Sequence, residues 1–294
     1  MSLRLSVLDQ SPIAKGRTPA EAVRDTLELA QLCDRLGYTR YWLAEHHSSE
    51  ALAGSAPEVL IARVAGLTER MRIGSGGVML PHYSAYKVAE NFRMLETLFP
   101  GRIDVGIGRA PGSDQHTMRI LADGKPNWSN AEKYPYQVRD LVAWLHDALP
   151  LNHEGTGVVA QPTGDTAPDV WLLGSSDDSA ALAAHFGLPF CFAHFINPDG
   201  GDGVTRAYRA HFKPSSLHPE PMPMMAISVP ARRPTRRPTC CHAAARSGRC
   251  DCGRSEIPAP SPRSRKRWRP RKRPARSDGC RRCAAVRWWV RPGP

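Results

Sequence analysis

The amino-acid sequence predicts an α/β protein, and more narrowly a (β/α)8 TIM-type barrel that is incomplete at its C-terminus. Strand-like and helix-like segments alternate throughout residues 1–229. The first four predicted strands begin near residues 3, 39, 72 and 102, so each repeat has the length of one βα unit. Seven such strands occur without a return to hairpins, and the pattern stops where the eighth unit should begin.

The first repeat has clearly marked helix ends. Residues 3–8 alternate as a strand does, and Thr18-Pro19-Ala20-Glu21 then combines an N-cap, a first-turn proline and a capping-box glutamate. Apolar residues at helical spacing continue to Gly37, where we expect the helix to end.

The later repeats follow the same order, although their spacing is looser in the second half. The remaining predicted strands are 39–44, 72–77, 102–108, 170–173, 189–193 and 222–229. One predicted helix begins at Pro57 and another includes Val88–Phe99. The remaining predicted helices span 132–148, 179–186 and 204–212. Cys33 and Cys191 fall on predicted core elements, which indicates buried thiols in a reducing, cytoplasmic setting.

Composition divides the chain at Val229. Residues 1–229 carry a net charge of −5, whereas residues 230–294 carry +17 and contain no Leu, Phe, Tyr or Met. The second segment also holds ten of the 27 prolines and six of the eight cysteines. Such a segment cannot bury enough apolar surface to offset its chain entropy. We therefore expect one barrel domain, 1–229, and an Arg/Pro/Cys-rich disordered tail, 230–294.

Three interpretations of the tail remain open. Its basic run around Trp268 has the composition of a nucleic-acid-binding segment, and Cys250, Cys252, Cys280 and Cys283 could bind zinc. We favour a third, that residues 230–294 are read out of frame, because frame-shifted GC-rich codons yield Arg, Pro, Ala, Gly, Cys and Trp. On that interpretation the chain is a catalytically impaired product.

The second predicted strand ends in Glu45-His46-His47. In parallel βα folds, functional groups gather where strands end, because the following loops converge there. Neighbouring strand residues point to opposite faces, so we expect one histidine to face the site and the other to bond behind it. Two solvated histidines at a strand end remain the alternative.

Two later strand ends offer groups that could bind a phosphate. Arg109 follows the fourth strand, and Gly174-Ser175-Ser176 precedes a predicted helix, whose N-terminus favours anions. The alternatives are an arginine paired with a surface carboxylate and an ordinary serine N-cap.

The third predicted strand ends in Gly74-Ser75-Gly76-Gly77-Val78-Met79-Leu80-Pro81. Glycines in a strand indicate close approach of a backbone or a ligand. A flat ring could lie on this backbone, although a bend at a barrel corner would also need glycine.

Together these motifs resemble the luciferase-like flavin monooxygenase family across residues 1–229. The resemblance rests on the opening strand, Glu45-His46-His47, the Gly74–Pro81 segment, Gly106-x-Gly108-Arg109 and Gly174-Ser175-Ser176. It implies a (β/α)8 barrel that binds FMN at the C-terminal ends of its strands and a non-proline cis peptide at Gly76-Gly77. The tail departs from the family, because it offers no seventh helix and no eighth unit.

The resemblance also implies roles for individual residues. His46 corresponds to the catalytic histidine. The implied cofactor-binding residues are Glu45, His47, Gly76, Gly77, Arg109, Gly174, Ser175 and Ser176. The implied reaction uses reduced FMN, supplied by a separate NAD(P)H-dependent reductase, and O2 to oxidise a small organic substrate. Residues 110–129 would close over the barrel mouth. Neither the substrate, the choice between FMN and a deazaflavin, nor the presence of a homodimer can be predicted.

Other classes are disfavoured by missing motifs. Neither H-E-x-x-H nor G-x-S-x-G occurs, so we expect no metal site and no serine hydrolase. We also expect no membrane segment and no nucleic-acid partner, although a basic interaction protein acting through the tail is the main competing class.

Overall fold

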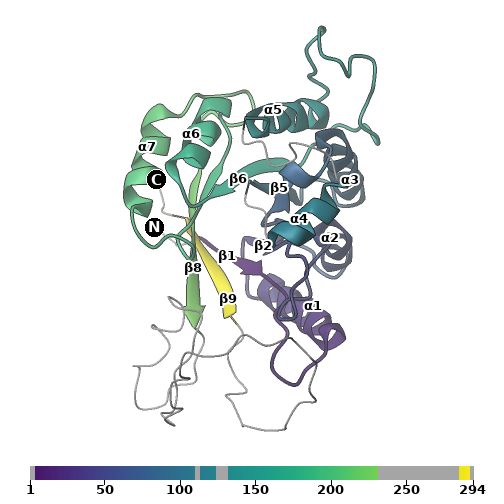
Figure 1. Cartoon of the computed structure of the whole chain (residues 1–294), viewed down its shortest axis with the longest axis vertical. Coiled ribbons are helices and arrows are strands. Elements are labelled where there is room, and N and C mark those ends of the chain that lie inside the picture. The colour runs from purple at the N-terminus through teal and green to yellow at the C-terminus, as the bar shows by residue number, and fades with distance from the viewer. Residues whose placement is uncertain (1–3, 110–112, 124–131, 231–284, 292–294) are drawn as a thin grey trace, which may run out of the picture.

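The computed structural model describes residues 4–109, 113–123, 132–230 and 285–291. The strands form one curved sheet, and the helices lie on its outer side (Figure 1). The strands are β1 (Arg4–Asp9), β2 (Arg40–Leu43), β3 (Arg72–Ser75), β4 (Val78–Met79), β5 (Ile103–Gly108), β6 (Asp169–Gly174), β7 (Phe190–Ala193), β8 (Pro223–Pro230) and β9 (Ala285–Arg291). The helices are α1 (Pro19–Arg35), α2 (Pro57–Ala65), η1 (Leu80–His82), α3 (Ala85–Leu98), α4 (Gln115–Leu121), α5 (Tyr134–Leu145), α6 (Asp177–Phe186) and α7 (Gly201–His211).

The predicted βα order is confirmed. All seven predicted strands are present, the third (predicted as 72–77) as β3, and β4 follows it as an additional short strand. Neighbouring strands pair in parallel from β3 through β2 to β1 and from β5 through to β8. A parallel pairing between β3 and β5 joins the two runs. The predicted helices are also present, and Thr18 caps α1 in the expected capping box with Glu21. The structure adds α4, which lies in the segment that we expected to cover the barrel mouth.

The position of an eighth strand is occupied, which the sequence did not predict. A barrel that lacks its eighth unit, as the sequence predicts, would leave β1 and β8 as unpaired edges. This expectation is wrong, because β9 pairs with both of them. Both pairings are antiparallel, whereas the other strands run parallel. The sequence Ala-Val-Arg-Trp-Trp-Val-Arg is rich in the β-branched and aromatic residues that favour strands, a signal hidden by the overall composition of the tail. In Figure 1, β8 and β9 lie side by side.

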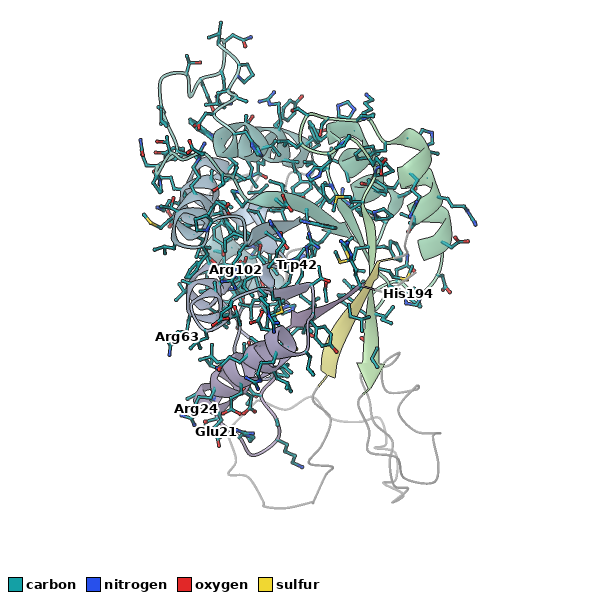
Figure 2. The ribbon with its side chains drawn as sticks, turned by 180° about the vertical axis from the view of Figure 1, so that it is seen from behind. Glu21, Arg24, Trp42, Arg63, Arg102 and His194 are labelled. Carbon is teal, nitrogen blue, oxygen red and sulfur yellow. The ribbon has the colours of Figure 1, made fainter. Side chains whose placement is uncertain are left out.

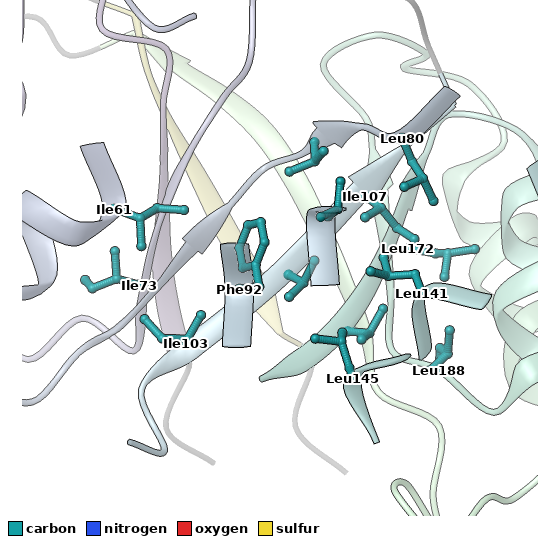
Figure 3. Packing of buried hydrophobic residues seen from close by; sticks show 14 of the residues in the cluster. Ile61, Ile73, Leu80, Phe92, Ile103, Ile107, Leu141, Leu145, Leu172 and Leu188 are labelled. Atoms are coloured by element: carbon teal, nitrogen blue, oxygen red, sulfur yellow. The ribbon is translucent and has the colours of Figure 1, made fainter. Parts of the chain in front are cut away.

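Alternation along the strands separates two packed regions. Val7, Tyr41 and Val170 point outward into the larger core between sheet and helices. Their neighbours Leu8, Trp42 and Trp171 point inward, where they pack with Cys191 and other residues inside the barrel. Figure 3 shows the outer core from close by, with Phe92 of α3 between isoleucines of neighbouring elements. Figure 2 shows Trp42 near the centre of the molecule and Arg63 and Glu21 on the outer helices.

The two buried-thiol predictions are confirmed. Cys33 and Cys191 are both buried and free. Burial raises the pKa of Cys33 to about 12 and that of Cys191 well above its usual value.

Candidate functional site

The carboxyl ends of the strands carry the residues that the sequence singled out. Glu45, His46 and His47 follow β2, Gly76 and Gly77 lie between β3 and β4, Arg109 follows β5, and Gly174, Ser175 and Ser176 connect β6 to α6. In a parallel barrel these ends share one rim. The structure therefore brings all the candidate residues to the same end of the barrel.

The two histidines bond in different directions, as expected. The Nε2 atom of His46 lies 2.8 Å from the amide nitrogen of Gln10, which follows β1. Since an amide NH2 only donates, Nε2 of His46 is the acceptor in this arrangement. His47 instead directs its Nε2 atom to Oε1 of Glu45 at 2.7 Å, where a carboxylate acceptor requires a proton on the ring nitrogen. His46 therefore bonds across to the end of β1, whereas His47 bonds back to Glu45 on its own strand end.

Glu45 lies behind the strand tip. It is 2% exposed, and its carboxylate accepts hydrogen bonds from the Met79 backbone N–H at 3.0 Å and the Tyr83 hydroxyl at 2.6 Å, besides His47. The sequence did not single out Tyr83 or Gln10. Gln10 could have been found by the same argument as His46, because it directly follows a strand.

The peptide bond between Gly76 and Gly77 is cis, as the resemblance implied. Packing alone explains why both residues are glycine. A Cβ at Gly76 would lie 2.5 Å from Cδ1 of Leu8, and one at Gly77 would lie 2.7 Å from the carbonyl oxygen of Gly106. The alternative that we left open, a tight corner of the barrel, therefore accounts for these glycines without a ligand.

Arg109 faces the N-terminus of α6. Its Nη2 atom lies 3.3 Å from Oδ2 of Asp178, in the first turn of that helix. Arg109 is thus paired with a surface carboxylate, which was the alternative interpretation from the sequence. The pair also shows that a guanidinium and a helix N-terminus lie next to each other, the combination that binds phosphate.

The loop before α6, residues 174–176, is fixed by a hydrogen bond and by close packing. The side-chain amide of Asn197 donates to the Ser175 carbonyl oxygen at 3.0 Å. Ser176 is the N-cap of α6, but its hydroxyl makes no capping hydrogen bond, so first-turn N–H groups are not occupied by it. Gly174 is required by packing, because a Cβ there would lie 2.3 Å from Oγ of Ser179.

These observations test whether FMN fits the rim. Arg109 and the α6 N-terminus offer charge and N–H groups for a phosphate. Beside them, a Cβ added at Gly108 would meet no atom of the described residues within 4 Å. The residues present fit a phosphate-bearing cofactor. Among the described residues, no cluster of three His, Cys, Asp or Glu side chains could hold a metal ion, and no helix is long and apolar enough to span a membrane.

Comparison with known proteins shows the family. The family model for luciferase-like monooxygenases matches residues 3–238, and the chain belongs to this family of oxidoreductases. It is 53% identical over 225 residues to the uncharacterized protein YwcH of Bacillus subtilis (strain 168), a match that covers 76% of this chain and 67% of YwcH. It is 43% identical over 219 residues to the N-acetyl-S-alkylcysteine monooxygenase of the same organism, covering 73% of this chain and 64% of the relative.

Solved structures agree on the fold. The crystal structure of apo-MsnO8 superposes with a TM-score of 0.71 at 42% identity, covering 76% of this chain and 65% of that one. The oxygenating constituent of 3,6-diketocamphane monooxygenase from the CAM plasmid of Pseudomonas putida, solved in complex with FMN, superposes with a TM-score of 0.56 at 19% identity, covering 73% and 65%. This chain spans about two-thirds of the length of these relatives.

Proposed function

We propose that this chain is an FMN-dependent monooxygenase, which uses reduced flavin and O2 to oxidise a small organic substrate. The observation that carries the proposal is the placement of Arg109 beside the N-terminus of α6, on the same rim as His46 and the Gly76-Gly77 backbone. Membership of the luciferase-like monooxygenase family supports the class of reaction. An FMN-bound structural neighbour with the same fold supports the cofactor.

Each candidate residue has a separate task in this proposal. Arg109 and the Ser175-Ser176 loop hold the FMN phosphate, with Arg109 exchanging Asp178 for the stronger phosphate pairing. The Gly76-Gly77 backbone presents a surface without side chains to the flavin ring. Bound reduced FMN supplies the electrons that activate O2.

His46 is the residue that we assign to proton movement. Its Nε2 atom is held by the Gln10 amide and accepts a hydrogen bond there, so the ring is oriented toward the rim. A neutral imidazole is suited to receive or return a proton near neutral pH. A reacting group that displaced the Gln10 amide would bond to Nε2 of His46 in its place.

Detection of an oxygenated product tests the proposal. Purified chain is mixed with FMN that a separate NADH-dependent reductase keeps reduced, and product is followed by mass spectrometry. Thioethers of N-acetylcysteine are the first substrates to try, because a 43% identical relative is named for that activity. Appearance of a product one oxygen atom heavier, dependent on the chain and on FMN, supports the proposal. Flavin oxidation without any oxygenated product across a broad substrate panel counts against it.

A further inference from the structure

The β2–β3 pairing stops at the Gly76-Gly77 peptide. Leu43 and Ser75 are the last paired residues, and the Gly76 N–H donates to the Leu43 carbonyl oxygen at 2.8 Å. After the cis bond the chain leaves β2 and pairs with β5, so that Val78 lies opposite Ile107. The segment that would carry the flavin ring is therefore no longer tied to β2 by backbone hydrogen bonds.

The Glu45 side chain spans this break. Its Oε2 atom accepts the Met79 N–H at 3.0 Å, a role that a neighbouring strand's carbonyl usually fills. Its Oε1 atom accepts from Tyr83, which follows η1, and from His47 on its own strand end. One carboxylate thus connects β2, β4 and the start of α3.

Burial makes these contacts strong constraints. Glu45 is 2% exposed, and a buried carboxylate that loses its hydrogen-bond donors is strongly destabilised. Burial raises the pKa of nearby Glu58, and the charge of Glu45 raises it further. Burial and, after it, the hydrogen bond to Glu45 raise the pKa of Tyr83, which keeps its hydroxyl a donor.

We propose that Glu45, His47 and Tyr83 form a positioning network that holds the Gly76–Met79 backbone and the adjacent His46 in place for flavin chemistry, rather than contacting the flavin. The proposal rests on the proposed function. Three protein donors already occupy most of the acceptor positions of the Glu45 carboxylate, and the side chain is buried, so little of it is left to contact a cofactor.

The chain offers a matched control for Tyr83. Tyr86 lies one turn further along, is also half-buried, and donates to Oε1 of Glu90 at 2.8 Å on the outer face of α3. Tyr86→Phe removes a tyrosine–carboxylate hydrogen bond of similar length away from the rim. Glu45→Gln and Tyr83→Phe remove one acceptor or one donor from the proposed network with little change in volume.

Two readouts separate the proposal from the proposed function. Amide hydrogen exchange without ligand is measured for residues 76–83, and FMN affinity is measured by quenching of flavin fluorescence. We expect Glu45→Gln and Tyr83→Phe to increase exchange in this segment at least tenfold and to weaken FMN binding about tenfold, while Tyr86→Phe changes neither. In the double variant the losses should not multiply, since Tyr83 acts through Glu45.

The outcomes are distinct. Unchanged exchange in residues 76–83, or losses in the double variant that multiply as independent effects do, overturns the network. An equal effect of Tyr86→Phe also overturns it, since any lost tyrosine bond would then suffice. If exchange changes as expected but the unaltered chain binds no FMN, the proposed function fails and the structural part of the network stands. Thermal unfolding of each variant confirms that the barrel is folded.

Discussion

The guanidinium of Arg109 and the carboxylate of Asp178 form an ion pair that joins the tip of β5 to the first turn of α6. Both side chains are substantially exposed, and pairs of this kind contribute only about 0–1 kcal/mol. A phosphate at the same helix N-terminus would offer Arg109 a partner with more charge and more acceptor atoms. In the proposed function, the FMN phosphate would therefore displace a weak ion pair at this place.

Replacing Arg109 should affect FMN more than riboflavin. Arg109→Ala is expected to weaken FMN binding by about 1.5–3 kcal/mol, the range for a hydrogen bond to a charged group. Riboflavin lacks the phosphate and should lose much less. Fluorescence titration with both ligands measures this difference. Arg139→Ala is the matched control, because Arg139 has similar exposure and pairs with Asp140 on α5. Equal losses for both flavins would place Arg109 outside the phosphate site.

Removing the competing carboxylate should act in the opposite direction. Asp178→Asn frees Arg109 and removes a negative charge beside the phosphate, so FMN should bind more tightly by about 1 kcal/mol or less. The gain should shrink at high salt, because exposed charges are screened. Titrations at low and high salt check both statements. Weaker FMN binding by Asp178→Asn would mean that the carboxylate supports the site.

His46 should control turnover and not cofactor affinity. We expect His46→Ala to retain FMN and to slow turnover by roughly 10²–10⁴, as expected when a proton-transfer group is lost. Rate measurements at saturating FMN test this. His185→Ala, on the outer surface of α6, serves as the control. If turnover is unchanged, the proton-transfer role passes from His46 to another residue.

Much of the fold could be predicted from the sequence, because βα repeats leave local signals. Capping residues, helical spacing and apolar runs located all seven parallel strands. The contacts of Glu45 could not be predicted, since its partners Met79 and Tyr83 are 34 and 38 residues away. Its strand-end position was visible, but the direction of its side chain depends on the break after Gly76. β9 was missed because its seven residues, four of them Val or Trp, lie within a segment of disfavoured composition.

The buried ion cluster around Asp104 was also beyond sequence reasoning, and it leads to a stability prediction. Asp104 is fully buried and accepts from Nε of Arg72 at 2.6 Å, Nε of Arg40 at 2.9 Å and Nε1 of Trp42 at 2.8 Å. Asp104→Asn removes the buried counter-charge of Arg40 and Arg72, leaves them only the partly exposed Asp169, and should cost about 3–5 kcal/mol.

Urea unfolding measures the cost at Asp104. The control is Asp202→Asn, which breaks an exposed pair with Arg206 that should contribute about 0–1 kcal/mol. A similar small loss for both variants would show that the cluster around Asp104 contributes nothing special.

Two histidines at the end of the barrel where the parallel strands begin should make the stability of the protein sensitive to acid. His146 and His218 line a cavity of about 300 Å³ beside Asp169, the first residue of β6, away from the proposed active site. Burial lowers the pKa of both, and Arg93 lowers that of His146 further. Below about pH 6.5 the unfolded chain takes up protons that the folded chain resists. Their contribution to stability is therefore present above that pH and is lost as the pH falls toward the folded values.

Unfolding free energies between pH 5 and pH 8 test this dependence. The pH dependence should become shallower in His146→Gln and His218→Gln, while the exposed His211→Gln should leave it unchanged. An equally steep loss of stability in all three variants would assign acid sensitivity to other groups.

A flavin titration of the full chain tests the central claim most directly. FMN and riboflavin are titrated in parallel, followed by flavin fluorescence, at two salt concentrations. The proposed phosphate site predicts one FMN per chain, bound clearly more tightly than riboflavin, with the preference abolished by Arg109→Ala. Failure to bind either flavin, or equal affinity for both in the unaltered chain, would contradict the assignment of this rim as an FMN site.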